Sequence, residues 1–486
     1  MSEARTPMRR VVVAGSGQVG VLAAIALKRA LPPCEIVVVD LPLGPASFAD
    51  RAASSLPFSN LLHDRLGIEE AQLVARAGAS HRLATRYIGW GGAQQHGMLT
   101  HGAQSEAEAQ TRFMRDWGGG GARNVTGERP PGSLAQVLAE AGRFAVPPDD
   151  QPSPLAEIDY ALRWNPPAYR GMLIKQAQRL GIAHAPGPVA AIEPDGKGGL
   201  AAIILEGQRR IEADLFVDCS GPSAILRSAL PEVELADWSA MLPVRRVMLA
   251  RPGNAMLALE DRVSLVPEGW LTELAGRDGL QVALGIGERT GDEAAVRALG
   301  EQPAEVVPVS PGCMRDPWSG NVVALGDAAA QFEPLGNLNL DCAHRQIDLL
   351  LEMLPGRDIV PLERAEYNRR AQLMFDGVCH TLALHYAAPR AREVFGEIAT
   401  PDAVTIALDQ FRRRGRLPFQ EEDPLGKQEK VALLLALGFE QGLPPQRAAI
   451  RPEEIEAARS AFDAKARAAL EFTPPYDQWM ASVLRG

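Results

Sequence analysis

The stretch RVVVAGSGQVG (residues 10–20) decides the fold of this chain. A run rich in β-branched residues leads into Gly15, Gly17 and Gly20, and residues 21–30 then have a helical composition. The first glycine permits a tight turn, the second lets the backbone approach a pyrophosphate, and the third allows close packing of helix against strand. The pyrophosphate then lies at the N-terminus of the helix. The stretch therefore predicts a strand, a phosphate-binding loop and a helix.

A second strand and an acidic residue complete the dinucleotide-binding unit. CEIVVVD (residues 34–40) has the pattern of a buried strand, so the order strand, turn, helix, strand predicts a βαβ unit. Asp40 ends this strand about 20 residues after the loop, where a carboxylate accepts hydrogen bonds from a ribose. An acid at this place suits an adenosine ribose without a 2′-phosphate.

Composition excludes several classes of protein. The 486 residues carry a net charge of -10, with 60 acidic and 50 basic side chains, which argues against a nucleic-acid partner. We interpret Arg412–Arg414 as a solvated helix end. The five cysteines have no C-x-x-C spacing, so neither a disulfide framework nor a metal site is expected, and the cytoplasm is the expected location. No apolar run approaches the roughly 18 residues of a membrane span.

Two later segments indicate FAD. NVVALGDAA (residues 321–329) places Gly326 and Asp327 directly after a strand and resembles the second FAD fingerprint of flavin monooxygenases. In those proteins the aspartate contacts the ribityl chain, and the helix that follows faces the flavin. ADLFVDCSG (residues 213–221) is a further strand that leads into a glycine turn. Nicotinamide dehydrogenases have no need of the last two segments, so the three together favour FAD.

The chain resembles the flavin-dependent tryptophan halogenases from about residue 8 to its C-terminus. The resemblance is carried, in order, by these segments: LGI (66–68), GAS (78–80), YIGW (87–90), FEPL (332–335), FD (375–376), HY (385–386), RPEEI (451–455) and Tyr476. In that family FADH2 from a separate flavin reductase reacts with O2 and halide. The hypohalous acid then travels through a tunnel to a lysine beside the aromatic substrate, where a glutamate helps to polarise it.

The resemblance also implies where the cofactor is held. We expect the FAD site to be formed by Gly15, Gly17, Gly20, Asp40, Val189, Gly326, Asp327, Pro334 and Leu335. A loop over residues 51–57 matches in length the segment that moves with flavin binding in the family, although its Gly-Glu is lost.

The positions of the family's chemistry are replaced. Arg82 stands where the catalytic lysine is expected, and a guanidinium stays charged and is a poor nucleophile and a poor acid. Arg82 can still hold an anion or hydrogen-bond an oxidant. Gly336 stands at the glutamate position, and only Trp270 survives of the W-x-W-x-I-P motif, whose tryptophans line the tunnel. Trp270 is equally well explained by core packing.

The halide position carries Leu338 and Asn339. Backbone N–H groups at a helix start can still bind an anion there. We expect Asn337 and Asn339 to cap the helix, with hydrogen bonding to the isoalloxazine as the alternative.

The predicted architecture is α/β: a Rossmann-like FAD-binding fold of the flavin monooxygenase and halogenase type with a mainly helical second module. We expect the FAD-binding module over residues 8–90 and 156–350, interleaved with a substrate sheet. We interpret residues 91–155 as a loop-rich insertion and residues 351–486 as the helical module.

The predicted function is that of an FAD-dependent oxidoreductase acting on an aromatic, indole-like small molecule or a peptide, with a homodimer as the candidate assembly. Two alternatives stay open: a redirected flavin monooxygenase, and a non-catalytic FAD-binding paralogue that partners an active halogenase. Candidate histidines near the active site are His81, His96, His101 and His344. A lone histidine is more often a surface residue or a satisfied core residue.

Overall fold

The computed structural model describes residues 6–93, 95–102, 133–147, 152–442 and 452–485. Much of the expected insertion, residues 91–155, and Arg451 of the RPEEI segment lie outside these ranges. Within them the insertion contains strand β5 (His96–Thr100) and helix α6 (Leu134–Ala141).

A six-stranded sheet forms the centre of the nucleotide-binding part. Its strand order is β19-β20-β11-β1-β2-β7, and only β19 runs antiparallel to its neighbour. The strands are β1 (Arg10–Ala14), β2 (Glu35–Val39), β7 (Ala183–Ala185), β11 (Leu215–Asp218), β19 (Trp318–Ser319) and β20 (Val322–Ala324). The predicted βαβ unit is β1, helix α1 (Gln18–Ala30) and β2.

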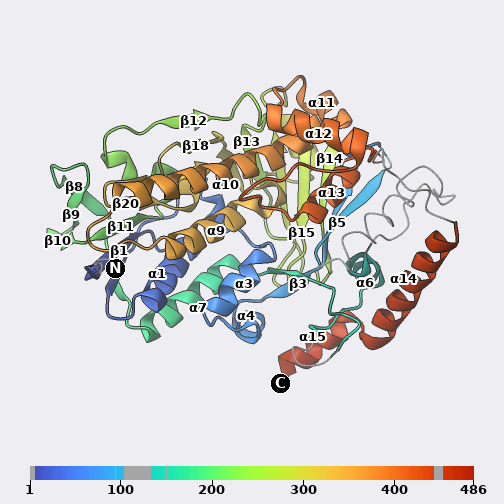
Figure 1. The fold of residues 1–486 in the computed structure, drawn as a ribbon, viewed down its shortest axis with the longest axis horizontal. Coiled ribbons are helices and arrows are strands. Elements are labelled where there is room, and N and C mark those ends of the chain that lie inside the picture. Colours follow the sequence, from blue (N-terminus) through green and yellow to red (C-terminus); the bar gives the residue numbers. More distant parts are fainter. Residues whose placement is uncertain (1–5, 94, 103–132, 148–151, 443–451, 486) are drawn as a thin grey trace.

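Both faces of this sheet are covered, which explains why its strands are apolar throughout and do not alternate. Val11 and Val13 of β1 pack with α1 in the main core, whereas Val12 faces a second cluster. That second cluster includes residues from a three-stranded antiparallel sheet: β8 (Val189–Pro194), β9 (Leu200–Leu205) and β10 (Arg209–Glu212). In Figure 1 this small sheet lies at the end of the molecule that also carries the N-terminus.

A second large sheet follows the order β17-β13-β16-β15-β14-β4-β5, with β14 and β4 as its one parallel pair. Its further strands are β4 (Ala84–Ile88), β13 (Arg246–Leu249), β14 (Glu260–Val266), β15 (Gly269–Leu274), β16 (Gln281–Ile286) and β17 (Glu305–Pro308). Short strands β3 (Ser80–Arg82) and β6 (Ala161–Arg163) pair separately. β3 leads directly into β4.

Helices dominate the C-terminal part, as predicted. They are α9 (Leu338–Glu352), α10 (Pro361–Ala387), α11 (Pro389–Phe395), α12 (Asp402–Arg414), α13 (Lys427–Ala436), α14 (Pro452–Phe472) and α15 (Tyr476–Arg485). Figure 1 shows α10 running from the parallel sheet towards the second sheet. None of the helices in the described ranges combines the length and apolar character of a membrane span.

Two local predictions differ from the structure. The helix expected directly after Asp327 is a short 3₁₀ turn (Gly326–Ala328) followed by strand β21 (Ala330–Gln331), and α9 begins only at Leu338. The composition of residues 61–78 (LLHDRLGIEEAQLVARAG) predicts one helix, but the structure has two, α3 (Phe58–Arg65) and α4 (Glu70–Arg76). Gly67, whose φ is 57°, lies between them, and this left-handed conformation does not continue a right-handed helix.

Candidate functional site

Four loops meet beyond the carboxyl ends of neighbouring strands, and we call this place the cradle. They are Gly15–Gly17 after β1, Asp40 after β2, Cys219–Gly221 after β11 and Gly326–Asp327 after β20. The strand order β20-β11-β1-β2 brings these loops to one edge of the sheet. In open α/β sheets this edge is where ligands bind, at the point where the strand order reverses.

Gly15 and Gly20 are fixed by close packing in the cradle. Gly15 has φ 120°, and a Cβ there would lie 2.2 Å from the carbonyl oxygen of Cys219. A Cβ on Gly20 would lie 2.1 Å from the carbonyl oxygen of Gly15. Both distances are far below van der Waals contact, so only glycine lets β1, β11 and α1 approach this closely.

Asp40 lies at the rim of the cradle with two polar neighbours. The hydroxyl of Ser16 donates a hydrogen bond to its carboxylate, and Arg170 of helix α7 (Pro166–Arg179) forms an ion pair with it at 3.6 Å. Arg170 also donates to the Ser16 hydroxyl at 2.8 Å. Because 43% of the Asp40 side chain is exposed, the carboxylate is still reachable from solvent. No pattern in the sequence singled out Arg170.

Asp327 is buried on the opposite side of the cradle. Gly326 before it has φ 62°, and its N–H donates to the side-chain oxygen of Gln346 at 2.8 Å. Burial raises the pKa of Asp327 well above its ordinary value, and the nearby Asp50 carboxylate acts in the same direction. One Asp327 oxygen accepts a hydrogen bond from the backbone N–H of Ala49 at 2.8 Å.

Residues 47–52 lie inside the cradle, and we call them the inner segment. They include the short helix α2 (Phe48–Arg51). The Asp50 carboxylate accepts a hydrogen bond from the backbone N–H of Val19 at 2.9 Å, in the first turn of α1. A Cβ on Gly17 would lie 2.2 Å from the same carboxylate. The Gln18 side chain donates to the carbonyl oxygens of Ala49 and Ala52, the latter at 3.0 Å.

The four loops that form the cradle suit a dinucleotide, but the inner segment lies between them. The N-terminus of α1, where a pyrophosphate belongs, is capped by Asp50. The carboxylate of Asp327, expected to meet the ribityl chain, is bonded to Ala49. FAD therefore fits these four loops only when the inner segment lies elsewhere.

The other expected cofactor residues lie near the cradle or at its margins. Val189 is half-buried in β8 and packs against the cluster that contains Ala14 and Val39, the last residues of β1 and β2. Leu335 is buried, and Pro334 is partly exposed, in the loop before α9. A contact of these three residues with FAD stays a prediction.

The guanidinium of Arg82 is bonded to groups inside the protein. Its side chain is 1% exposed and donates to the Thr85 hydroxyl at 2.6 Å and to the carbonyl oxygen of Ser55. It also forms an ion pair with Asp261 at 3.4 Å, and Asp261 is shared with Arg163 at 2.9 Å. This buried trio, Arg82, Asp261 and Arg163, gives the guanidinium a structural role, so the expectation that Arg82 holds an anion or an oxidant has no support in these contacts.

Trp270 belongs to the core of the second sheet. It is fully buried in β15, and its ring lies so close to Gly285 that a Cβ there would be 2.1 Å away. Its indole N–H donates to the Tyr386 hydroxyl at 3.1 Å, and Tyr386 in turn donates to the Glu333 carboxylate. These contacts favour the core-packing interpretation over a tunnel lining.

Glu333 is a titratable group that the sequence offered no separate reason to choose. Burial raises its pKa to about 7, even though the hydrogen bond from Tyr386 acts in the opposite direction. A carboxyl with this pKa changes protonation state near neutral pH, which suits proton transfer. Only its place in the FEPL segment pointed to it.

The turn before α9 is left-handed at two successive residues. Gly336 has φ 72° and Asn337 has φ 61°. The prediction that asparagines cap this helix is wrong: Asn337 occupies the capping position without a side-chain hydrogen bond, and Asn339 donates to the carbonyl oxygen of Phe332 at 2.9 Å. Leu338 is buried beside them. The left-handed backbone, which turns the chain into α9, explains why the Asn337 side chain does not reach the helix amides.

The candidate histidines do not gather into one site. The ring nitrogens of His81 contact Tyr476 and Glu70, both at 2.9 Å. Neighbouring residues of a strand point to opposite faces, so His81 and the adjacent Arg82 have different surroundings. His101 pairs with Glu429 at 2.8 Å, and His344 with Ser59 at 2.8 Å. Burial lowers the pKa of His344 well below its ordinary value. His96 is exposed in β5.

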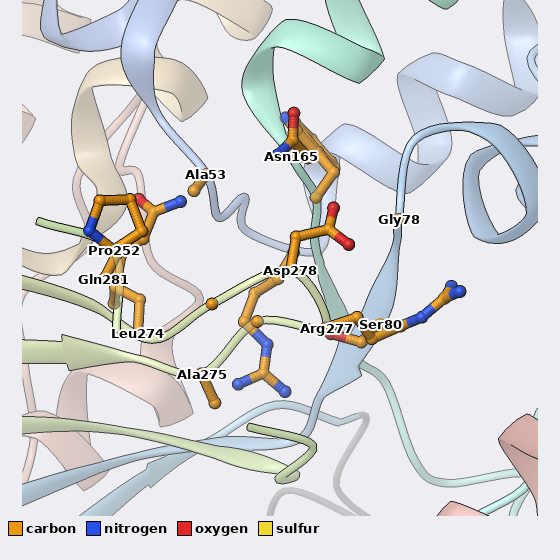
Figure 2. Close-up of a pocket in the computed structure, with 14 residues that line it drawn as sticks. Ala53, Gly78, Ser80, Asn165, Pro252, Leu274, Ala275, Arg277, Asp278 and Gln281 are labelled. Carbon is orange, nitrogen blue, oxygen red and sulfur yellow. The ribbon is translucent and has the colours of Figure 1, made fainter. Parts of the chain in front are cut away.

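A pocket lies beside the inner segment and holds about 510 Å³ of empty space, part of it open to solvent. In Figure 2, Ala53 and Asn165 lie on one side of it, and Leu274, the last residue of β15, and Ala275 after it lie on the other. Arg163 of the buried trio also lines it. No sequence pattern pointed to Asn165, although Leu274 and Ala275 stand at the last two positions of the altered W-x-W-x-I-P motif.

Metal ligands and cysteine thiols are the remaining groups that could form a reactive site. Within the described ranges no three His, Cys, Asp or Glu side chains are grouped as metal ligands. All five cysteines are buried free thiols. Burial raises the pKa of Cys219 in the cradle well above its ordinary value, so its reactive thiolate form is disfavoured.

Comparison with known proteins places this geometry in a family. The profile of the tryptophan halogenase family matches residues 10–449. The chain is 23% identical to tryptophan 7-halogenase RebH of Lentzea aerocolonigenes, covering 97% of this chain and 98% of the relative. It is 23% identical to tryptophan 7-halogenase KtzQ of Kutzneria sp. (strain 744), covering 95% of each.

Solved structures agree with the predicted fold. Xcc4156, a flavin-dependent halogenase from Xanthomonas campestris, superimposes with a TM-score of 0.86 at 23% identity and 98% coverage of both chains. BrvH, a flavin-dependent halogenase from Brevundimonas sp. BAL3, gives 0.84 at 23% identity, covering 98% of this chain and 99% of that one. The predicted α/β Rossmann-like fold is confirmed, and the relatives and solved structures named here are halogenases. The chain belongs to the tryptophan halogenase family.

Proposed function

We propose that this chain binds FAD in the cradle and uses FADH2 and O2 on an aromatic, indole-like small molecule or a peptide. The single observation that carries the proposal is the meeting of the Gly15–Gly20 loop, Asp40 and Gly326–Asp327 beyond adjacent parallel strands. Bound FADH2 would supply two electrons to O2, so that one oxygen atom enters the substrate and the other leaves as water. The proposal includes a separate flavin reductase, a cytoplasmic location and a homodimer.

The proposed reaction is a direct oxidation of the substrate, without halogenation. The guanidinium of Arg82 cannot replace a lysine, because it stays charged and is bonded to Thr85, Ser55 and Asp261. Gly336 brings no carboxylate to the turn before α9. A redirected flavin monooxygenase needs neither group, and this supports it over a halogenase.

A non-catalytic partner of an active halogenase is the second candidate. Two observations favour it: the inner segment lies inside the cradle, and both positions of the family's chemistry are replaced. Such a partner would accelerate no reaction of FADH2 with an aromatic substrate by itself.

One experiment separates these functions. The purified protein is mixed with FADH2 and an indole panel, then exposed to O2 with bromide present, and the products are read by mass spectrometry. A hydroxylated indole supports the proposal, and a brominated indole contradicts it. Products identical to those of free FADH2 alone support the non-catalytic partner.

The double variant Arg82→Lys with Gly336→Glu tests whether the lost groups are the only barrier. We expect no brominated product, because a lysine at position 82 cannot keep all three guanidinium contacts. A glutamate at position 336 must also take a left-handed φ, which costs about 1–2 kcal/mol. The matched control for folding is Arg86→Lys, because Arg86 also forms an ion pair, with Glu260 on the next strand. Bromination by the double variant would show that the scaffold still supports halogenation.

A further inference from the structure

We infer that the inner segment, residues 47–52, is a built-in plug of the cradle, in which Asp50 takes the place of the FAD pyrophosphate. FAD then binds only after this segment has been displaced. The inference rests on the proposed function, because it presumes that the cradle is an FAD site.

The first support is the contact of Asp50 with α1. The N-terminus of a helix attracts anions, because its first N–H groups have no partner in the helix and the helix dipole is positive there. The Asp50 carboxylate accepts from Val19 at 2.9 Å and lies over Gly17, the glycine that leaves room for a pyrophosphate. Asp50 is 7% exposed, so its anion is enclosed in the same place.

The plug touches each of the three glycine loops of the cradle. Ala49 donates to Asp327 at 2.8 Å, at the second fingerprint. Ser47 lies against Gly221, where a Cβ would be 2.3 Å from its hydroxyl oxygen. Together with Asp50 at Gly17, these contacts match the three segments that the sequence assigned to FAD.

Electrostatics make the plug and the pyrophosphate mutually exclusive. The same Val19 N–H cannot serve both acceptors, and a diphosphate beside the Asp50 carboxylate would place like charges at close range in a poorly solvated site. The charged groups that face Asp50 are Asp327 of the second fingerprint and Arg170 of α7. Arg170 attracts either anion and therefore does not discriminate between them.

An external clamp holds the plug in position. Arg51 forms an ion pair with Glu305 of β17, and donates to the carbonyl oxygen of Pro45 at 2.7 Å. Both partners lie outside the cradle, so the clamp can be loosened without altering any residue that would meet FAD.

The test is a titration of oxidised FAD against the full chain by flavin fluorescence. We expect Asp50→Ala to bind FAD at least about tenfold more tightly than the wild type, which corresponds to about 1.4 kcal/mol. Asp50→Asn keeps an acceptor without the charge, as protonated Asp50 does, so it should bind FAD no more tightly than the wild type. Glu305→Gln should bind about twofold more tightly. Asp292→Asn, the same substitution in the first turn of the exposed helix α8 (Asp292–Leu299), is the control and should bind as the wild type does.

Hydrogen exchange gives a second measurement that does not depend on Asp50→Ala folding well. In the wild type, saturating FAD should increase exchange at the amide of Ala49, which leaves Asp327, and keep that of Val19 protected. Equal FAD affinity in the wild type, Asp50→Ala and Glu305→Gln, with no change in exchange at Ala49, would overturn the plug and leave the proposed function standing. A lack of FAD binding by every variant would overturn the proposed function as well.

Discussion

The cradle differs from the positions that the resemblance assigns to the family's chemistry in what has been retained. In the cradle the retained residues act through backbone geometry, as Gly15 and Gly20 do at distances that exclude any side chain. At the positions where the resemblance expects a catalytic lysine and glutamate, Arg82 and Gly336 stand instead, and Arg82 is bonded to Thr85 and Asp261. A fold can thus be preserved by its steric demands after the chemistry of its side chains has changed.

The largest expected loss of stability is that of a variant at Asp261, and it tests whether Arg82 is a structural residue. Asp261→Asn leaves Arg82 and Arg163 buried without a counter-charge, so we expect a loss of about 3–5 kcal/mol in the free energy of unfolding. The midpoint of urea denaturation measures it. Glu35→Gln, which removes a surface partner of Arg10, should cost less than about 1 kcal/mol. A cost at Asp261 as small as that of the control would show that Arg82 is not structural.

The next effect concerns the steric demand of the cradle. Gly15→Ala combines a left-handed φ with a clash against the Cys219 carbonyl, so we expect a loss of about 3 kcal/mol and loss of FAD binding. Gly187→Ala is the matched control: its φ is 107°, but no atom lies within 4 Å of the new Cβ. It should cost only the conformational strain, about 1–2 kcal/mol. Similar melting temperatures for the two variants would contradict the packing argument.

The smallest expected effect is a pH dependence of FAD affinity. Burial raises the pKa of Asp50 to about 6 from 3.8, so the plugged state binds a proton more readily than an open state in which Asp50 meets water. The plugged state is therefore favoured below about pH 6 and loses this advantage as pH rises through that value. We expect FAD to bind several-fold more tightly at pH 7 than at pH 5.

Asp50→Asn serves as the control for this pH dependence. Asp327 in the cradle, whose pKa is also raised, remains in this variant, so a slope that persists is assigned to Asp327. An unchanged slope would remove Asp50 from the explanation. Cys219, whose pKa is raised partly by Asp50, stays neutral throughout this range.

The sequence predicted the parts of the molecule whose causes are local. The β-branched run of β1, the glycine spacing after it and the acid at the end of β2 are each readable within a few residues, and the structure has a βαβ unit there. Each of the three FAD segments was also readable as a strand followed by a glycine turn. They meet because the parallel strands β1, β11 and β20 bring their ends to one edge.

The rest depends on contacts between distant positions. Arg82, Arg163 and Asp261 meet because β3 pairs with β6 and β14 runs beside β4, and no periodicity predicts such a trio. The sequence pointed only to residues 51–57 as a loop matching the segment that moves with the flavin, whereas residues 47–52 lie inside the cradle. Their place depends on Asp50, which has no motif. The failed cap at Asn337 has the same origin, since the left-handed turn there is set by the packing of the chain before α9.

The bond between His81 and Tyr476 has a consequence for the order in which the chain folds during synthesis. The backbone N–H of His81 in β3 donates to the Tyr476 hydroxyl at 2.7 Å, across 395 positions of the sequence. A ribosome makes the chain from its N-terminus, and N-terminal parts generally fold first. The cradle strand β1 can therefore pair with β2 early, whereas β3, which carries Arg82, receives its last hydrogen bond only when α15 has emerged.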